Sequence, residues 1–324
     1  MSEFDPTRRP EWLRIRLRTD TGFRRVRTMV SELRLNTVCT EARCPNIYEC
    51  WNAGTATFMI LGDICTRRCG FCSVRSGRPA AGVDPLEPQH VAEAVSRLAL
   101  RHAVLTSVDR DDLDDGGAGH FRNVVLAIRQ RRPGCAVEVL TPDFKNKPGA
   151  VDVVLEARPE VFAHNVETVP RLYRTARPGS NYRGSLELLA AARRRRDRGQ
   201  AEGMRTKSSL MLGLGERDEE VLEVLRDLRE TGVDVVTLGQ YLQPTRKHLP
   251  VQRFVSPAEF DAFRERAVEM GFLHVESGPL VRSSYHAERH RPDPPAAADD
   301  VGTPPSLRLL QPAATSAGRD PLPR

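Results

Sequence analysis

The sequence has little lysine, few aromatic residues and no long apolar run. Only four of its 49 basic side chains are lysines, and aromatic residues fill 6% of the 324 positions. No apolar stretch approaches the roughly 20 residues that a membrane-spanning helix needs. The first 20 residues lack the apolar core of a secretory signal and carry early acids. We therefore expect a cytoplasmic protein that makes no use of a membrane.

The formal charge is positive, at +6, and part of it lies at the N-terminus. Residues 1–38 hold nine arginines against five acidic side chains. This basic arm has no interleaved aromatic residues and no recognised nucleic-acid-binding module. We therefore expect no nucleic acid partner, and we favour an acidic protein partner over a merely solvated surface.

Cysteine is concentrated in one stretch, with six of the seven cysteines inside 34 residues. The first group, spaced C-x4-C-x5-C, is Cys39, Cys44 and Cys50. The second group, spaced C-x3-C-x2-C, is Cys65, Cys69 and Cys72. Thiolates at this density are ligands of iron–sulfur clusters or of zinc. A disulfide framework is not favoured, because disulfide-dense domains are small and secreted. The seventh cysteine, Cys135, is expected to be a buried apolar thiol.

Both cysteine groups lack a nearby fourth ligand, and His90 lies 18 residues beyond the last of them. A structural zinc site requires four protein ligands, so a pair of zinc knuckles is the weaker alternative. Two groups of three instead indicate two cubane clusters, each with one iron that needs a ligand from elsewhere.

The motifs around these cysteines resemble those of a known family. The string CTRRCGFC resembles the signature of the radical S-adenosylmethionine (SAM) enzymes, in which SAM chelates the fourth iron. The string CTEARCPNIYEC resembles the auxiliary-cluster motif of the lipoyl synthase family. Near the C-terminus, GPLVRSSYHA (278–287) resembles that family's R-S-S-Y-x-A motif, in which a serine oxygen ligates the auxiliary cluster. The resemblance assigns this role to Ser284, with Ser283 left open, and places Arg282 near the site or substrate.

Strand and helix patterns alternate along the middle of the chain. The predicted strands span 55–62, 103–107, 136–141, 160–165, 206–212, 233–241 and 272–278, with helical patterns between them. Such alternation favours an α/β fold with parallel strands. Six βα units are too few for a closed eight-fold barrel, and the resemblance implies a partial (β/α)6 TIM-like barrel with N-terminal and C-terminal extensions.

The predicted domain organisation follows from these patterns. Residues 1–54 form an N-terminal arm and helix that carry the auxiliary-cluster motif. Residues 55–289 form the partial barrel and end in the serine motif. Residues 290–324 are rich in proline and alanine and are expected to be a disordered tail without a catalytic role.

Further candidate residues lie at the predicted carboxyl ends of strands, where parallel α/β folds build their sites. Asn165 and Glu167 resemble the Asn-x-acid element that holds the SAM ribose, although Glu167 has a structural alternative as a first-turn acid of the next helix. Gly213 and Gly215 resemble the family's glycine-rich turn beside the adenine. Lys207 is a candidate for the SAM carboxylate, with a lysine at the strand edge as the alternative.

Two weaker candidate regions complete the predicted SAM site. The acidic stretch TSVDRDDLDDGG (106–117) offers an acid or a carbonyl for the SAM ammonium group, the alternative being a plain acidic turn. Gln240 and Arg246 are expected near cofactor or substrate.

The resemblance implies the chemistry of a sulfurtransferase. Two [4Fe-4S] clusters and SAM would insert sulfur at carbons six and eight of a protein-bound octanoyl chain, with the auxiliary cluster consumed as the sulfur donor. Expected partners are octanoylated lipoyl domains or the glycine-cleavage H protein, a reductant such as flavodoxin or ferredoxin, and an iron–sulfur carrier protein for cluster repair. The alternatives are a biotin synthase-like enzyme, a methylthiotransferase, or a zinc-binding nucleic-acid module.

Overall fold

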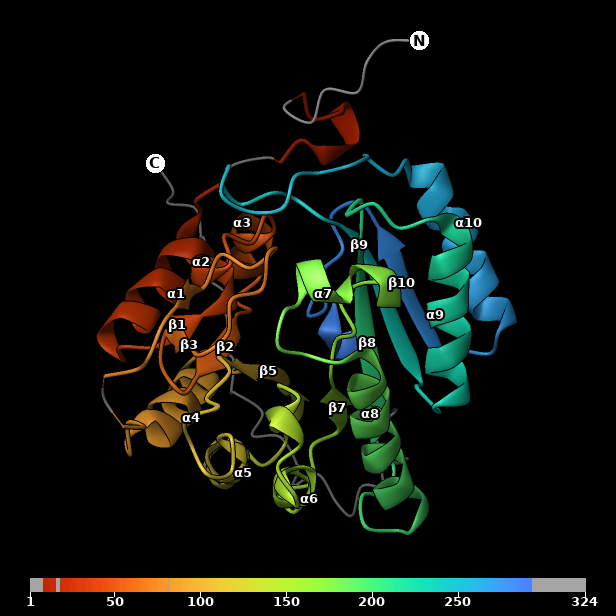
Figure 1. The fold of residues 1–324 in the computed structure, drawn as a ribbon. Coiled ribbons are helices and arrows are strands. Elements are labelled where there is room, and N and C mark those ends of the chain that lie inside the picture. Colours follow the sequence, from red (N-terminus) through yellow and green to blue (C-terminus); the bar gives the residue numbers. More distant parts are fainter. Residues whose placement is uncertain (1–7, 16–17, 81, 293–324) are drawn as a thin grey trace, which may run out of the picture. The chain divides into compact units, whose positions relative to one another are not determined.

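The chain forms a curved, mostly parallel sheet with helices on its outer face (Figure 1). The computed structural model describes residues 8–15, 18–80 and 82–292. The main sheet has the order β1-β2-β5-β6-β7-β8-β9-β10. Its strands are β1 (Asn36–Thr37), β2 (Thr57–Ile60), β5 (His102–Ser107), β6 (Ala136–Leu140), β7 (Val161–Ala163), β8 (Arg205–Leu212), β9 (Val235–Gln240) and β10 (His274–Gly278). All neighbours pair in parallel except β1, which runs antiparallel to β2.

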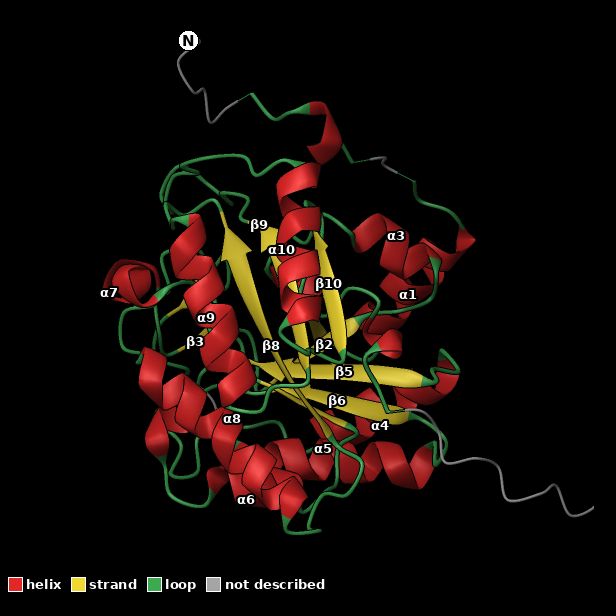
Figure 2. Cartoon of the chain, turned by 90° about the vertical axis from the view of Figure 1, so that its right-hand side faces the viewer, coloured by secondary structure: helices red, strands yellow, loops and turns green. Residues whose placement is uncertain are grey.

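A helix follows each parallel strand and leads to the next one, as parallel pairing requires. These helices are α4 (Glu87–Arg97), α5 (Ala118–Arg131), α6 (Ala150–Leu155), α8 (Tyr182–Asp197), α9 (Asp218–Glu230) and α10 (Pro257–Glu269). Their apolar faces pack on the outward-facing strand residues and form two large buried clusters. In the side view of Figure 2 the helices lie around the strands. The two ends of the strand order do not pair, so the described barrel is open, which confirms the predicted partial barrel.

The N-terminal elements pack as a small unit beside β2. They are α1 (Thr21–Glu32), α2 (Val38–Glu41) and α3 (Ile47–Asn52). Phe23 of α1 lies with its ring centroid 5.1 Å from that of Trp51 on α3. The Asn52 side chain accepts hydrogen bonds from the backbone amides of Asp20 and Phe23, which closes the start of α1. This packing holds the first cysteine group against the edge of the barrel.

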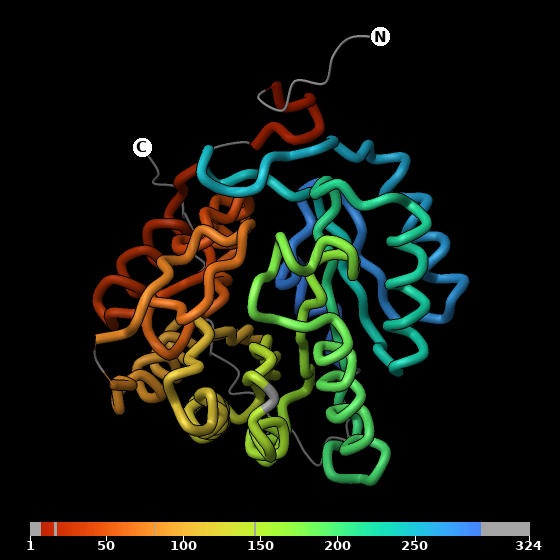
Figure 3. The backbone as a smooth tube through the Cα atoms, viewed as in Figure 1, coloured from red at the N-terminus to blue at the C-terminus, as the bar shows by residue number. Residues whose placement is uncertain are grey.

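Two further segments frame the carboxyl ends of the strands. The connection between β9 and α10, cyan in Figure 3, crosses over this end toward the N-terminal helices, where Arg43 contacts the Pro244 carbonyl. A short two-stranded sheet, β3 (Ile64–Cys65) with β4 (Arg75–Ser76), and the short helix α7 (Tyr173–Ala176) lie in the connections. Short 3-10 turns complete the described elements: Glu11–Leu13, Phe144–Asn146, Pro170–Leu172 and Ala287–Arg289.

The ends of the predicted domains are only partly described. Of the predicted tail 290–324, residues 293–324 lie outside the described residues; His290 is fully buried in the packed part. Cys135 is buried, as expected of an apolar thiol. None of the helices in the described ranges has the length and apolarity to cross a bilayer.

The interior of the barrel contains a buried ion pair. The ammonium of Lys207 on β8 lies 2.6 Å from Glu138 Oε1 on β6, and both side chains are essentially inaccessible. Burial alone would raise the pKa of Glu138, but the charge of Lys207 and contacts with His102 lower it to about 2. Burial lowers the pKa of Lys207, and the charge of Glu138 opposes that change, so each charge of the pair depends on the other.

We expect Lys207→Met to destabilise the protein by about 3–5 kcal/mol, because it leaves the Glu138 carboxylate buried without its partner. The double variant Lys207→Met/Glu138→Leu should recover most of the loss, since no charge then remains unpaired. Chemical denaturation of anaerobically purified protein measures both, with the exposed Lys247→Met as control. A Lys207→Met protein as stable as wild type would contradict this account.

Candidate functional site

One cavity of about 310 Å³ opens at the carboxyl ends of the parallel strands. It is lined by residues that end or follow the strands, among them Thr106, Leu140, Asn165, Met211 and Gln240. Its walls also include Cys65, Cys69 and Cys72, residues 282–284, and neighbours of the first cysteine group, namely Val38, Arg43 and Pro45. Residues of all three motifs singled out in the sequence therefore line one cavity, although Cys39, Cys44 and Cys50 are not themselves among the lining residues.

The second cysteine group lies on a loop that begins at β3 and is tied down from two sides. The Gly70 amide donates to the Ala176 carbonyl, and the Leu249 amide donates to the Gly70 carbonyl. A Cβ at Gly70 would lie 2.9 Å from the Leu249 side chain, so a larger residue would require a neighbour to shift. All three thiols are free, and burial raises the pKa of Cys69 to about 12 and that of Cys72 to about 11.

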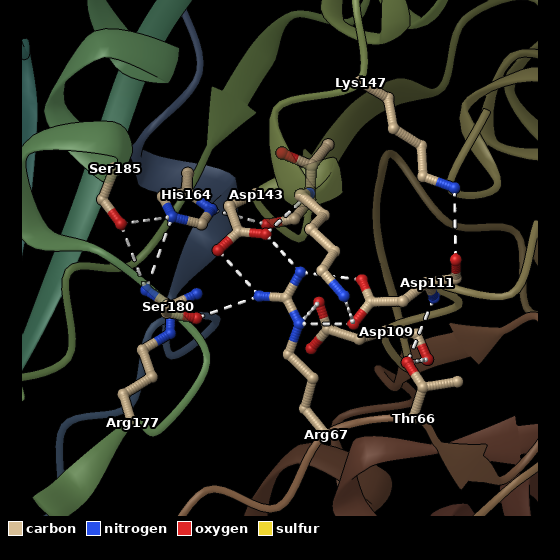
Figure 4. Close-up of polar contacts among 12 residues, drawn as sticks. Thr66, Arg67, Asp109, Asp111, Asp143, Lys147, His164, Arg177, Ser180 and Ser185 are labelled. Atoms are coloured by element: carbon tan, nitrogen blue, oxygen red, sulfur yellow. Dashed lines mark hydrogen bonds and ion pairs between the residues drawn. The ribbon is translucent and has the colours of Figure 1, made fainter. Parts of the chain in front are cut away.

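Arg67, between the first two cysteines of this loop, is the centre of a buried ionic network (Figure 4). Its guanidinium donates to Asp111 at 2.8 Å and to Asp143 Oδ2 at 2.7 Å, and its Nε lies 3.4 Å from Asp109. A further hydrogen bond reaches Ser180. Burial opposes ionisation of Asp143, but hydrogen bonds and charge from Arg67 hold its pKa well below the ordinary value. This network fixes the loop to the ends of β5 and β6.

Asp109 also faces the cysteines directly. Its Oδ2 lies 3.7 Å from Cys65 Sγ, and its backbone amide donates to the same sulfur. Its Oδ1 is the oxygen that lies 3.4 Å from Arg67 Nε, and it accepts no hydrogen bond from the described residues. The residue itself lines the cavity. The acidic stretch 106–117 was predicted as a whole, and Asp109 is the acidic residue of this stretch among the cavity-lining residues.

Asn165 and Glu167 both line the cavity, beyond the end of β7. The Asn165 side-chain oxygen is buried without a hydrogen-bond partner in the described chain. Glu167 has φ +67°, a strained conformation for this residue type, and its backbone pairs with Ser209 and Met211 of β8. Burial raises the pKa of the Glu167 carboxyl group. Strain at a cavity residue is a common feature of functional sites.

Arg177 is a cavity residue that sequence reasoning missed. Its guanidinium donates to the Asn165 carbonyl at 2.8 Å and lies near the ring of His164 and the hydroxyl of Ser185 (Figure 4). Its positive charge acts against the burial that raises the pKa of Cys69. It follows α7, and the only sequence signal is a basic residue before a Pro-Gly turn.

Lys207 lies away from the cavity. It shares the inward face of β8 with Ser209 and Met211, which line the cavity, but it lies deeper in the barrel and pairs with Glu138. The Lys207 ammonium group is therefore paired with Glu138 inside the barrel. This corrects the expectation that Lys207 contacts the SAM carboxylate.

The glycine turn and the two weaker candidates are arranged as follows. Gly213 and Gly215 have φ +99° and +107°, and neither is among the cavity-lining residues. The Gly213 amide donates to the Glu216 carboxylate, and a Cβ there would clash with the Gln240 side chain. Gln240 lines the cavity, but its amide is occupied by backbone hydrogen bonds. Arg246 is exposed and outside the cavity lining.

The first cysteine group lies where the C-terminal segment returns to the barrel. Burial raises the pKa of Cys39 to about 11, and the neighbouring Cys44 thiol contributes to the rise. Burial raises the pKa of Cys50 to about 12, and the Cys39 and Cys44 thiols contribute to the rise. For Cys44 burial raises the pKa while the charge of Arg282 opposes it. The three thiols are therefore close enough to interact.

Hydrogen bonds join the C-terminal serine motif to this group. Thr57 Oγ1 of β2 donates to Ser284 Oγ at 2.9 Å, and the Thr57 backbone also contacts the Cys39 thiol. Asn46 Nδ2 donates to the Leu280 carbonyl at 2.8 Å, and the Tyr285 hydroxyl donates to Glu49. The serine motif is thus held beside residues 39–50.

The donor set fits the groups that the motifs imply. Each cysteine group offers three free thiols, which suits a cubane cluster with one iron left for another ligand. The Asn165 side-chain oxygen, buried without a hydrogen-bond partner among the described residues, points to a polar ligand beside the second group. The serine hydroxyls stand beside the first group.

Known proteins resemble this chain over most of its length. Residues 59–239 match the radical SAM superfamily. The chain is 55% identical over 285 residues to a lipoyl synthase from Rubrobacter xylanophilus, covering 88% of this chain and 87% of the relative. It is 57% identical, with the same coverage, to a lipoyl synthase from Methylococcus capsulatus.

Solved structures share the fold at low sequence identity. SuiB of Streptococcus suis, in a structure bound to S-adenosylmethionine, superposes with a TM-score of 0.51 at 11% identity, covering 72% of this chain and 54% of that one. This chain thus spans about half the length of SuiB. Methylornithine synthase superposes with a TM-score of 0.50 at 15% identity, covering 81% and 83%. The fold, the cavity and the two sequence relatives agree, and the chain belongs to the lipoyl synthase family of the radical SAM superfamily.

Proposed function

We propose that this cavity inserts two sulfur atoms, at carbons six and eight, into an octanoyl chain carried by a lipoyl domain. The observation that carries the proposal is the meeting of both cysteine motifs and the serine motif at one cavity. Its lining also includes Val38, Met59, Leu140 and Val281, and such apolar walls suit an aliphatic chain.

Cys65, Cys69 and Cys72 are proposed to hold the [4Fe-4S] cluster that membership of the radical SAM superfamily implies. When bound, that cluster and SAM supply the 5′-deoxyadenosyl radical that removes hydrogen from the octanoyl chain. The Asp109 carboxyl group lines the cavity and is suited to accept a hydrogen bond from the SAM ammonium group. Asn165 and Glu167 supply an amide and a carboxyl group suited to the two ribose hydroxyls.

Arg67 and Arg177 are proposed to position these groups. Arg67 holds Asp109 and the cysteine loop in one arrangement, and Arg177 holds the backbone at Asn165. Both guanidinium groups are largely buried, so their contacts persist without competition from water.

The second cluster is proposed as the sulfur-donating substrate, held by Cys39, Cys44, Cys50 and Ser284. Ser284 is preferred to Ser283 because Thr57 contacts both its hydroxyl and the Cys39 thiol. A hard serine oxygen binds soft cluster iron less firmly than a thiolate does, so this bond suits a cluster that must be dismantled. Arg282 lies beside Cys44 and offsets negative charge there.

The proposed partners follow from the same reaction. The lipoyl-bearing partner includes the glycine-cleavage H protein as an alternative to lipoyl domains. Electrons come from flavodoxin or ferredoxin, and an iron–sulfur carrier protein restores the spent cluster. The free thiols suit a reducing cytoplasm. Residues 1–54 are proposed as the unit that delivers the sulfur donor to the barrel of 55–289.

Mass spectrometry of an octanoylated lipoyl-domain peptide tests the function. Anaerobic incubation with the protein, SAM and a reductant should convert the octanoyl group to the lipoyl group, with 5′-deoxyadenosine formed in parallel. Omission of SAM or of the reductant should abolish both products. A peptide that stays octanoylated while 5′-deoxyadenosine accumulates would reject sulfur insertion and leave only SAM cleavage.

Substitutions in the two cysteine groups should separate the two half-functions. Cys69→Ala removes a proposed ligand of the SAM-binding cluster, so SAM cleavage should fall to background. Cys44→Ala removes a proposed ligand of the sulfur donor, so cleavage should continue while no lipoyl product forms. Chromatography of 5′-deoxyadenosine and peptide mass spectrometry measure the two steps, and lipoyl product from Cys44→Ala would exclude the sulfur-donor role.

Arg67→Lys should slow SAM cleavage about 10–100-fold, the usual cost of losing a group that orients cluster ligands. A lysine cannot reproduce the forked contacts of the guanidinium with Asp111 and Asp143. The matched control is Arg246→Lys, at an exposed position outside the cavity. SAM cleavage rates and iron content are measured for both variants. Equal cleavage rates would disprove a positioning role for Arg67.

A further inference from the structure

The barrel interior contains a second polar cluster, separate from the cavity. TIM-like barrels usually fill this space with branched apolar side chains. Here the space holds imidazole, carboxylate and ammonium groups, and none of them is among the cavity-lining residues. The cluster consists of His102, Glu138, Lys207, His274, Glu276 and His290.

Three members of this cluster converge from two segments. His274 and Glu276 are two residues apart on β10 and share one face, while Val275 between them packs on the outer core. His290 follows the turn Ala287–Arg289, which packs near β5. One possible ligand atom from each of His274, Glu276 and His290 lies within 4.8 Å of the other two.

The distances suit a small coordination sphere. His274 Nε2 lies 3.1 Å from Glu276 Oε1, and the rings of His274 and His290 have centroids 4.8 Å apart. Ligand atoms on a tetrahedral zinc ion lie roughly 3.4 Å apart, given bonds of about 2.0–2.1 Å. Small side-chain rotations therefore suffice to bring three ligands onto one ion.

His290 supplies an independent indication of a ligand. Its side chain is fully buried, yet neither ring nitrogen has a hydrogen-bond partner among the described residues. A buried imidazole in this state loses its hydration without compensation, which costs on the order of 1–3 kcal/mol. Such a group in a native protein requires an explanation, and a bound ion is one.

Charge near the three residues is compatible with a cation. Glu276 brings a carboxylate, and its ionic neighbour, Arg289 at 3.9 Å, is largely exposed and free to turn outward. Deeper in the barrel the ammonium of Lys207 is already paired with Glu138. The carboxylate of Glu276 therefore remains available to a metal ion.

We propose that His274, Glu276 and His290 bind a divalent transition-metal ion, with zinc the best match. Two imidazoles and one carboxylate are an established zinc ligand set, with water in the fourth position. Nitrogen and oxygen donors also disfavour Cu(I) and iron–sulfur clusters, which select thiolates. The ion joins β10 to the segment 279–292, which carries Ser283 and Ser284, and so fastens that segment across the open side of the barrel.

The test uses the whole protein with its iron–sulfur clusters reconstituted, dialysed anaerobically against buffered micromolar zinc. Elemental analysis should find about one zinc per chain in addition to the iron. X-ray absorption at the zinc edge should show only nitrogen and oxygen neighbours, with the multiple scattering typical of imidazole. His290→Ala and Glu276→Gln should lose the zinc and keep the iron, whereas Cys44→Ala should keep the zinc.

The matched control is His90→Ala, which removes a histidine outside the cluster and should keep the zinc. Sulfur neighbours in the wild-type spectrum would assign the zinc to empty cysteine sites and overturn the proposal. The proposal would also be overturned if the wild-type protein bound no zinc, or if the double variant His274→Ala/His290→Ala retained zinc. The wild-type spectrum decides even if a variant fails to fold, and none of these measurements depends on lipoyl formation.

Discussion

The arrangement of the cavity depends on one buried guanidinium. Arg67 lies inside the cysteine loop, and its carboxylate partners come from the chain beyond β5 and beyond β6. The loop therefore cannot move without breaking charge-assisted hydrogen bonds in a site that water barely reaches. Because Asp109 contacts both Arg67 and Cys65, the same network sets the position of a thiol and of a carboxylate that faces the cavity.

The strand order and the motifs that line the cavity could be predicted from the sequence, because motif spacing and strand periodicity are local signals. The parallel strands lie within a few residues of their predicted ranges, and residues of the cysteine and serine motifs line one cavity. How deep in the barrel an inward-facing residue lies cannot be predicted in this way, because it depends on how neighbouring strands are tilted and staggered. Lys207 shows this: its inward face was predictable, but its pairing with Glu138 depends on β6 and β8 meeting across the interior.

Contacts between distant segments were the other missing information. Asp143 and Arg177 have no motif of their own, and their importance comes from neighbours 76 and 12 positions away in the chain. The glycine turn shows the converse. Gly213 and Gly215 need positive φ, as a turn residue would, yet the space beside Gly213 is filled by Gln240 rather than by a ligand. A glycine at such a turn predicts that another group lies close to the backbone, but it does not predict whether that group is a side chain or a ligand.

The open side of the barrel links the two sites. A closed barrel has no free edges, whereas here β1 and β10 end the sheet and the C-terminal segment returns between distant parts of the chain. Asn46 and Thr57 hold that segment at the level of the cavity. At the far end of the C-terminal segment, buried His290 lies beside His274 of β10. The proposed role of Ser284 as an iron ligand requires its oxygen to lie in a defined place. The metal site proposed at His274, Glu276 and His290 would fasten the segment at its second end, which suits this role better than contacts at the cavity alone.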